Sequence, residues 1–301
     1  MIYFKLLLTA FLWGGTFIAG RMIAPSVYPV CAAFLRFAIA TLFLLLLLVR
    51  VEGRIPVPGK KQILPIVLLG LTGVFAYNIL FLTGLKYIQA GRAALIVDTN
   101  PVLISLLSAL FFREQLNWTK AVGICLSVTG AMIVISNGRI AELGSYRIGT
   151  GELLIAGCVL SWVAYSLIGK SVMAQLSPLT SVAYSAVVGT ILLLPPALYS
   201  GIGREIFSYT VKDWADLFYL GFFGTVLGFS WYYQGIERIG PMKASVFINF
   251  VPVSAIVLAA LILKEQITVS IVLGTMLVIT GVCLTNASGV FRRYMRKPLP
   301  R

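Results

Sequence analysis

The chain contains one stretch of sequence twice. Residues 84–138 and 235–289 match at a fixed offset of 151 positions, mostly at glycines, prolines and one polar turn, with apolar residues between them. A long apolar chain built from two copies of one half is typical of a transporter, because two halves can rock about a site held between them. The matches include Gly84 with Gly235, Ile88 with Ile239, Ala93 with Ala244, Pro101 with Pro252, Glu114 with Glu265, Gly130 with Gly281 and Gly138 with Gly289.

The composition places most of the chain in lipid. Of the 301 residues, 59% are hydrophobic and only 11% are charged, whereas a soluble domain is roughly 25% charged. The formal net charge of +14 lies mostly in short segments between apolar runs, where orientation signals and contacts to anionic lipids occur. This placement argues against nucleic acid as a partner.

Residue types that support catalysis or metal binding are scarce. Histidine is absent, which removes the commonest metal ligand and the usual general base near neutral pH. The four cysteines lie in apolar runs without C-x-x-C spacing and are interpreted as small core residues. We therefore predict no catalytic residues, no metal site and no cofactor, and we do not expect an enzyme.

Ten apolar segments satisfy the requirement of about 20 mostly apolar residues for a membrane span. The first segment is not interpreted as a secretory signal, because Trp13 and Gly20 match Trp162 and Gly169 at an offset of 149. Each half then contains five spans, and because five is odd, the second half enters the membrane from the opposite side. The predicted fold is an all-α integral membrane protein with ten transmembrane helices as two inverted five-helix repeats. The segments cover approximately residues 4–22, 30–50, 64–83, 92–112, 118–136, 151–172, 178–200, 214–234, 242–263 and 269–286.

The predicted organisation has four parts. Residues 1–137 form the first repeat, 138–150 the linker, 151–289 the second repeat and 290–301 a basic cytoplasmic tail. Lys and Arg are more frequent in the segments on the side of the N-terminus than in those on the other side. This bias favours both termini in the cytoplasm.

An ordered set of motifs links the chain to a known family. The first helix of each half carries a tryptophan (FLWGGTF and LSWVAYS), the fourth and ninth spans contain a proline, and a basic-Glu-Gln turn follows each of them. In this combination the whole chain resembles a two-repeat member of the EamA branch of the drug/metabolite transporter superfamily. The resemblance implies a ten-helix carrier of the bacterial inner membrane, usually an exporter of amino acids, other metabolites or drugs.

Two ionisable side chains stand clearly inside predicted spans, Arg36 in the second and Asp98 in the fourth. Ionisable groups at membrane depth are costly and mark functional sites by default. At 1.5 Å per residue, both lie about 9 Å from the outer end of their helices, and Asn78 of the third span reaches a similar depth. Together with Tyr77 and Asn100 they are predicted to form one polar layer.

The charges of this layer have no counterparts in the second repeat. An asymmetric pocket on a symmetric scaffold suits a substrate with one charged end. The aligned residues are Ser185 for Arg36, Asn249 for Asp98 and Phe229 for Asn78.

More than one role is open for Arg36 and Asp98. They can pair with each other, which neutralises two groups that could not be buried alone. A substrate can also part them, so that Arg36 takes a carboxylate and Asp98 an ammonium group. In addition, Asp98 is a candidate for proton coupling, because it is the only acid deep in a predicted span.

Aromatic residues form a second candidate constellation. Trp13 and Trp162 lie near the middle of their helices, whereas membrane tryptophans usually lie at the interface. Tyr165 shares a helix face with Trp162, and Tyr184 lies in the next span. These residues are interpreted either as helix packing or as the walls of a central cavity for apolar or aromatic substrates.

The remaining assignments concern bends and interfaces. Pro101 and Pro252 each leave a backbone carbonyl without its helical partner one turn earlier, and we expect them to act as hinges. We assign Tyr232 and Tyr233 to the inner interfacial belt. Glu114 and Glu265 are expected beside the N-termini of the helices that follow them, where the helix dipole favours an anion.

The sequence thus predicts a secondary transporter that works by alternating access, first of all an exporter of amino acids or related small metabolites. A metabolite importer and a multidrug exporter of the same family stay open, as do a membrane enzyme and a non-transporting scaffold from other classes. The expected partners are a small-molecule substrate and the lipid bilayer; the oligomeric state is open, a monomer included. The predicted substrate-binding residues are Trp13, Arg36, Tyr77, Asn78, Asp98, Asn100, Trp162, Tyr165, Tyr184 and Asn249.

Overall fold

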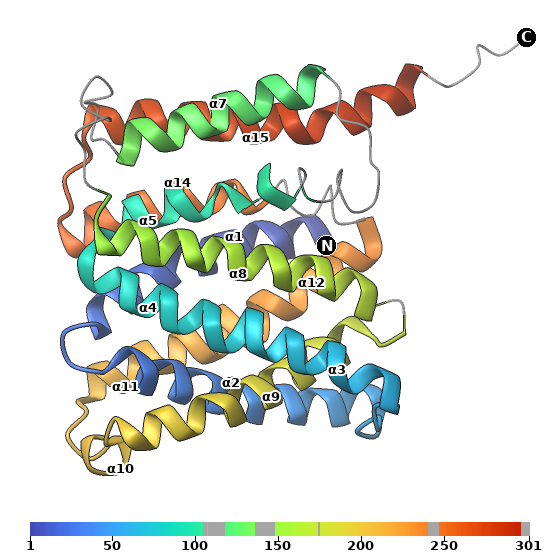
Figure 1. Cartoon of the computed structure of the whole chain (residues 1–301), viewed down its shortest axis with the longest axis vertical. Coiled ribbons are helices and arrows are strands. Elements are labelled where there is room, and N and C mark those ends of the chain that lie inside the picture. The colour runs from blue at the N-terminus through green and yellow to red at the C-terminus, as the bar shows by residue number, and fades with distance from the viewer. Residues whose placement is uncertain are drawn as a thin grey trace, which may run out of the picture.

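A computed structural model describes residues 1–100, 102–104, 107, 118–135, 148–173, 175–239 and 247–295. This part of the chain is helical and has no strand, which confirms the predicted all-α class for the described residues. In Figure 1 the helices run side by side along one common direction. In chain order they are α1 (Ile2–Ile23), α2 (Pro29–Glu52), α3 (Lys60–Leu69), η1 (Gly70–Ala76), α4 (Tyr77–Tyr87), α5 (Ala90–Val97), α7 (Trp118–Ile135), α8 (Thr150–Val172), α9 (Pro178–Tyr199), α10 (Ile202–Glu205), α11 (Val211–Phe218), η3 (Tyr219–Leu227), α12 (Gly228–Ile239), α14 (Phe250–Leu258), η4 (Ala259–Leu263) and α15 (Val269–Met295).

Within the described ranges, five helices are long and apolar enough to cross a membrane. Large apolar side chains such as Leu42 and Leu46 of α2 are exposed on the outside of the bundle. Lipid accommodates such a surface, whereas in water it would favour aggregation. The five helices cover Ile2–Ile23, Pro29–Glu52, Lys60–Tyr87, Thr150–Gly169 and Pro178–Tyr199, and shorter apolar helices cover Ala121–Gly130, Phe250–Leu263 and Val269–Gly281.

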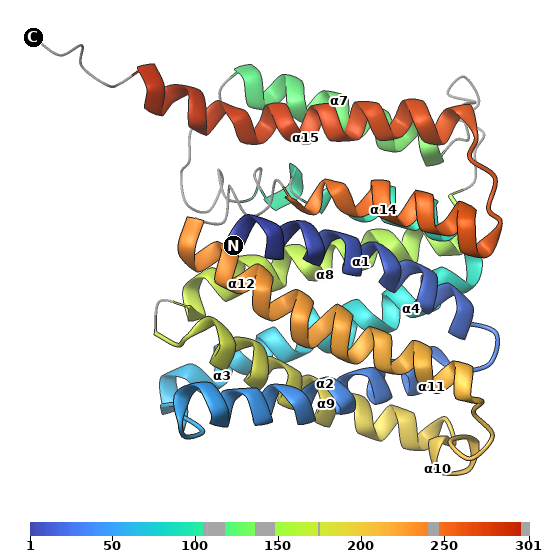
Figure 2. The same ribbon diagram turned by 180° about the vertical axis from the view of Figure 1, so that it is seen from behind.

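The helices of the first half pack mainly against those of the second. α7 lies along α15, and α2 lies along α9 (Figure 1 and Figure 2). α1 contacts α12 and α14, and α8 makes the corresponding contacts with α4 and α5. Likewise η3 packs on α2, and η1 packs on α9. Contacts between the halves therefore come in matched pairs.

The two ends of the bundle can be told apart by the chain ends. The start of α1 and the end of α15 lie at one end, on the right in Figure 1, which we call the N-terminal end. α5 and α8 begin at the opposite end, which we call the far end. Their first turns are joined there by an ion pair between Arg92 and Glu152.

The third helix of each half contains a wider, π-helical stretch, η1 and η3. A π-helical turn leaves carbonyls without their usual helical partners, and such turns are frequent at functional sites. Here side chains fill the gaps: the Asn78 amide donates to the Val74 carbonyl over 2.8 Å, and the Thr225 hydroxyl donates to the Leu220 carbonyl over 3.0 Å. The sequence pattern did not predict either stretch.

Two helices are broken at matching positions. α5 ends at Val97, residues 98–99 form a turn, and the chain is helical again at Asn100. In the second half, Asn249 forms a turn directly before α14. Each break lies shortly before a proline in the sequence, whose missing N–H cannot bond the carbonyl four residues earlier. Pro252 is buried in α14, and Pro101 lies outside the described residues.

Candidate functional site

Arg36 is buried between η3 and the start of α4, with only 3% of its surface exposed. Its Nε donates to Thr225 Oγ1 over 3.1 Å, and its Nη1 donates to Asn78 Oδ1 over 2.8 Å. The predicted proximity of Arg36 and Asn78 is thus confirmed. Arg36 ties α2 to η3 and to the start of α4, and the polar partners solvate its charge without neutralising it.

Asp98 is also buried, with 2% of its surface exposed. Asp98 and Arg36 do not form the ion pair that was one interpretation of the sequence. The two charges therefore do not belong to a single polar layer. α2 packs mainly against α9, η3 and α4, whereas α5 packs mainly against α14 and α8. Both carboxylate oxygens of Asp98 lack a hydrogen-bond donor in the described part of the chain.

Two further buried acceptors lie at the helix breaks. Asn100 and Asn249 are 5% and 2% exposed, and the Oδ1 atom of each lacks a donor among the residues described. α5 and α14 run antiparallel, since the Glu265 carboxylate beyond α14 accepts from the backbone N–H of Gly91 at the start of α5. A β-carbon built on Gly91 would lie 3.2 Å from Ile256. The spacing from Gly91 to Asp98 equals the spacing from Asn249 to Ile256. Because the helices are antiparallel, this register places the two breaks at the same depth.

An aromatic cluster fills the centre of the bundle. The rings of Trp13 and Trp162 meet edge to face with centroids 6.0 Å apart, an arrangement that aromatic pairs prefer. Tyr77, Tyr165 and Phe229 each place a ring within 5.2 to 5.3 Å of Trp162. The structure thus brings four predicted aromatic residues together, on α1, α4 and α8.

Tyr232 and Tyr233 also belong to this cluster, so their assignment to an interfacial belt is wrong. Both are buried, and their rings lie 5.2 Å from Trp13 and 6.2 Å from Tyr165, respectively. The fold puts them there because α12 runs beside α1, so that its inward face meets Trp13. The sequence alone does not determine which face of α12 turns inward, so it did not exclude an interfacial position for these tyrosines.

Tyr184 lies apart from the cluster. Its hydroxyl donates to the carbonyl of Pro56, in the segment that joins α2 to α3. The structure therefore does not bring Tyr184 together with the other predicted binding residues.

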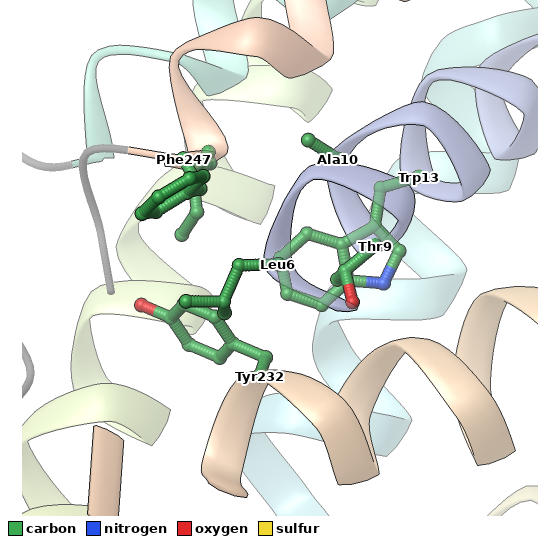
Figure 3. A pocket seen from close by; sticks show the side chains of 7 residues that line it. Leu6, Thr9, Ala10, Trp13, Tyr232 and Phe247 are labelled. Atoms are coloured by element: carbon green, nitrogen blue, oxygen red, sulfur yellow. The ribbon is translucent and has the colours of Figure 1, made fainter. Parts of the chain in front are cut away.

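A pocket opens beside Trp13, with about 140 Å³ of empty space. Figure 3 shows Tyr232 from α12 and Phe247, before α14, on either side of the first turns of α1. The space is well below the roughly 300–1,000 Å³ of a typical ligand pocket. Its lining residues are Leu6, Thr9, Ala10, Trp13, Tyr232, Phe247 and Ile248.

Thr225 and Phe229 complete the site and were not among the predicted residues. Thr225 binds Arg36, and Phe229 touches both tryptophans. Thr225 gave one weak signal, a hydroxyl within an apolar span. Nothing in the sequence indicates that Phe229 is a binding residue, because a phenylalanine in a membrane helix most often faces lipid or packs against a neighbouring helix.

Polar contacts close the far end of the bundle between the two halves. Arg92 Nη2 lies 2.9 Å from Glu152 Oε1. Glu265 accepts from the backbone N–H groups of Ala90 and Gly91 over 3.0 and 3.3 Å. Glu265 therefore binds a helix N-terminus, as the dipole favours, but it is that of α5 and not of the helix that follows it. Glu114 lies outside the described residues.

A capping box at the far end fixes the start of α11. The Thr210 hydroxyl accepts from the backbone N–H of Asp213, and the Asp213 carboxylate accepts from the backbone N–H of Thr210. Ser26, after α1, donates to the same carboxylate. Burial on its own would raise the pKa of Asp213, but the hydrogen bonds from Ser26 and Thr210 outweigh it and lower that pKa.

A bundle of apolar helices around buried charges and aromatic rings defines an integral membrane transport protein. The sequence profile of the EamA-like transporter family matches residues 1–136 and 149–287. The chain therefore belongs to the EamA family. It is a multi-pass membrane transporter and not an enzyme, with a small-molecule substrate and a lipid environment.

Individual relatives agree with this assignment. The uncharacterized transporter YyaM of Bacillus subtilis is 31% identical over 291 residues, which cover 97% of this chain and 94% of YyaM. A protein of Streptantibioticus cattleyicolor named a probable terminal-alkyne amino-acid exporter is 29% identical over 239 residues, 78% of this chain and 77% of its own. A solved crystal structure shares the fold with a TM-score of 0.68 at 19% identity, covering 97% of this chain and 98% of the other.

Proposed function

We propose that this transporter exports amino acids or related small metabolites by alternating access. The observation that carries the proposal is the pair of buried, opposite charges, Arg36 and Asp98, that do not neutralise each other. Uncompensated charges inside a membrane protein are costly. A zwitterionic amino acid supplies both missing partners, a carboxylate for Arg36 and an ammonium group for Asp98.

The aromatic cluster supports a substrate with an apolar part. Trp13, Tyr77, Trp162 and Tyr165 offer ring faces and edges in one cluster, and Tyr77 precedes Asn78, which binds Arg36. Such surfaces stack on apolar or aromatic groups. The pocket at Trp13 is smaller than a typical ligand pocket, so in the proposed mechanism the two halves move before the substrate enters.

The proposed architecture has ten transmembrane helices in two inverted repeats, residues 1–137 and 151–289, with a linker at 138–150 and a tail at 290–301. Support comes from the matched contacts between the halves, the matched π-helical stretches and the matched helix breaks. In this proposal Pro101 and Pro252 let the helices bend at the breaks as the halves rock. The excess of Lys and Arg on the side of the N-terminus supports cytoplasmic termini in a bacterial inner membrane.

The direction and substrate class draw support from one relative. The Streptantibioticus cattleyicolor protein is named a probable terminal-alkyne amino-acid exporter. By analogy with that name, the proposed direction here is export of an amino acid from the cytoplasm.

Counterflow in proteoliposomes tests the proposal. Vesicles loaded with one unlabelled compound are offered the same compound with a radioactive label, across a panel of amino acids and aromatic drugs. We expect at least one amino acid to exchange, and replacing Arg36 with Gln to reduce its exchange more than tenfold. Trp118, exposed on α7, provides the control variant Trp118→Phe, which should exchange like the wild type. Exchange of drugs alone would contradict the proposed substrate class, and a panel without any exchange would contradict the proposal as a whole.

A further inference from the structure

We infer that Asp98, Asn100 and Asn249 form a binding site for a monovalent cationic group, the protonated amine of the substrate. The inference rests on the proposed transport of amino acids and assigns one end of the substrate to a defined place in the fold. The place is the pair of facing helix breaks between α5 and α14.

The site consists of acceptors that lack donors. At the two helix breaks, four oxygen atoms are buried without a hydrogen-bond partner in the described residues: both carboxylate oxygens of Asp98 and the Oδ1 atoms of Asn100 and Asn249. Buried acceptors in native proteins are normally satisfied, and each exception requires an explanation, such as a functional role or a bound ion. An ammonium group carries three donors and a positive charge, which is the complement of this set.

The backbone at the breaks adds to the preference for a cation. α5 ends at Val97, directly before Asp98, and the carbonyl end of a helix carries partial negative charge. Interrupted helices at corresponding positions of two repeats are a recurrent way of building ion and substrate sites in transporters. The register of α5 and α14, fixed by Gly91 against Ile256, brings Asp98 and Asn249 to one depth.

The described part of the chain places no cation at this site. Arg36 directs its donors at Asn78 and Thr225, and Arg92 pairs with Glu152 at the far end. Within the described ranges, Asp98 forms no ion pair. A neutral or anionic ligand would leave the carboxylate uncompensated, so the ligand group that fits is cationic.

The internal repeat provides a direct test. Asn249 occupies the position in the second repeat that Asp98 occupies in the first. The exchange variant Asp98→Asn with Asn249→Asp moves the carboxylate across the α5–α14 seam and keeps the number of acids and amides constant. Asp98→Asn alone removes the charge with almost no change in volume, and size-exclusion profiles in detergent check that each variant is folded.

Two readouts report on the amine. In counterflow, the wild type should discriminate at least tenfold against the N-acetyl derivative of its amino acid, which lacks the charged amine. Asp98→Asn should lose most of this discrimination and raise the KM of the parent amino acid about tenfold, and the exchange variant should regain a large part of both. Asp216→Asn, the same change in α11, is the matched control and should behave like the wild type.

The second readout does not depend on transport. The methyl ester of the amino acid keeps the amine and lacks the carboxylate, so it probes the amine-binding site alone. It should raise the thermal unfolding midpoint of the detergent-solubilised wild type and the control, but not that of Asp98→Asn. This measurement can be made even if no compound is exchanged. A failure of the proposed transport function can therefore be told apart from a failure of the amine site.

Three outcomes would overturn the assignment. Equal competition by N-acetyl and parent amino acids in the wild type would show that the amine is not recognised. A requirement for Na⁺ over K⁺ that disappears in Asp98→Asn, with amine discrimination unchanged, would assign the oxygens to Na⁺ instead. Loss of pH-gradient-driven flux in Asp98→Asn, again with discrimination unchanged, would leave Asp98 as a proton carrier only.

Discussion

At the scale of single residues, the two buried charges of the site differ in their hydrogen-bond partners. Arg36 has polar partners on two helices, whereas Asp98 has none in the described part of the chain. The sequence could predict that both residues are buried and functional, because charges in apolar spans are rare and costly. It could not predict that they lie apart, because the spacing along a helix does not determine which neighbouring helix a side chain faces.

Replacing Arg36 with Lys tests the double hydrogen bond. A lysine ammonium keeps the charge but cannot present the planar guanidinium fork that reaches Thr225 and Asn78 together. A hydrogen bond to a charged group contributes about 1.5–3 kcal/mol, so we expect the KM for the amino acid to rise roughly tenfold or more, as measured by counterflow. Arg50→Lys, at the exposed end of the same helix, should leave the KM unchanged. An unaltered KM in Arg36→Lys would show that only the charge matters.

Asp213 predicts a dependence of stability on acid. Its pKa is lower in the folded protein than in the unfolded chain, so its stabilising effect is complete above the unfolded value of about 3.9 and is lost as the pH falls through the lowered folded value. Thermal unfolding in detergent between pH 6 and pH 3 should therefore show a steeper loss of stability in the wild type than in Asp213→Asn. Parallel curves for the two proteins would contradict this account.

At the scale of helices, the interruptions matter as much as the spans. The prolines predicted the breaks before Asn100 and α14 through a simple rule, since proline cannot donate a helical hydrogen bond. The π-helical stretches were not predictable, because they depend on tertiary contacts. Gly73, for example, lets the Tyr165 ring approach so closely that an added β-carbon would lie 2.2 Å from it.

Restoring the helical hydrogen bonds tests the role of the breaks. In the variant with Pro101→Ala and Pro252→Ala, each alanine can donate to the carbonyl four residues earlier, which straightens and stiffens the helix. We expect the maximal rate of counterflow to fall at least fivefold while thermal stability in detergent is kept or increased. Pro300→Ala in the tail is a suitable control. Unchanged transport kinetics in the double variant would count against bending at these positions.

At the scale of the whole molecule, the halves are joined by matched contacts but differ in their chemistry. The repeated glycines, prolines and tryptophans allowed the prediction of an all-helical membrane protein. The positions where the repeats differ pointed to Arg36, Asn78 and Asp98, and the structure places all three in the interior. The far-end contacts of Arg92 with Glu152 and of Glu265 with α5 escaped prediction, because they join residues whose partners lie in the other half.

The far end must open if substrate is to leave on that side. Arg92→Cys and Glu152→Cys place one thiol on each half at the ion pair, in a background from which the four native cysteines have been removed. A short bifunctional thiol reagent that carries a disulfide then links the halves reversibly. The two single-cysteine variants, treated in the same way, are the controls.

Counterflow of a transported amino acid before linking, after linking and after reduction is the most direct test of alternating access between the two halves. We predict that exchange continues in the single-cysteine controls, stops in the linked protein and returns when the link is reduced. Exchange at an undiminished rate in the fully linked protein would contradict the account.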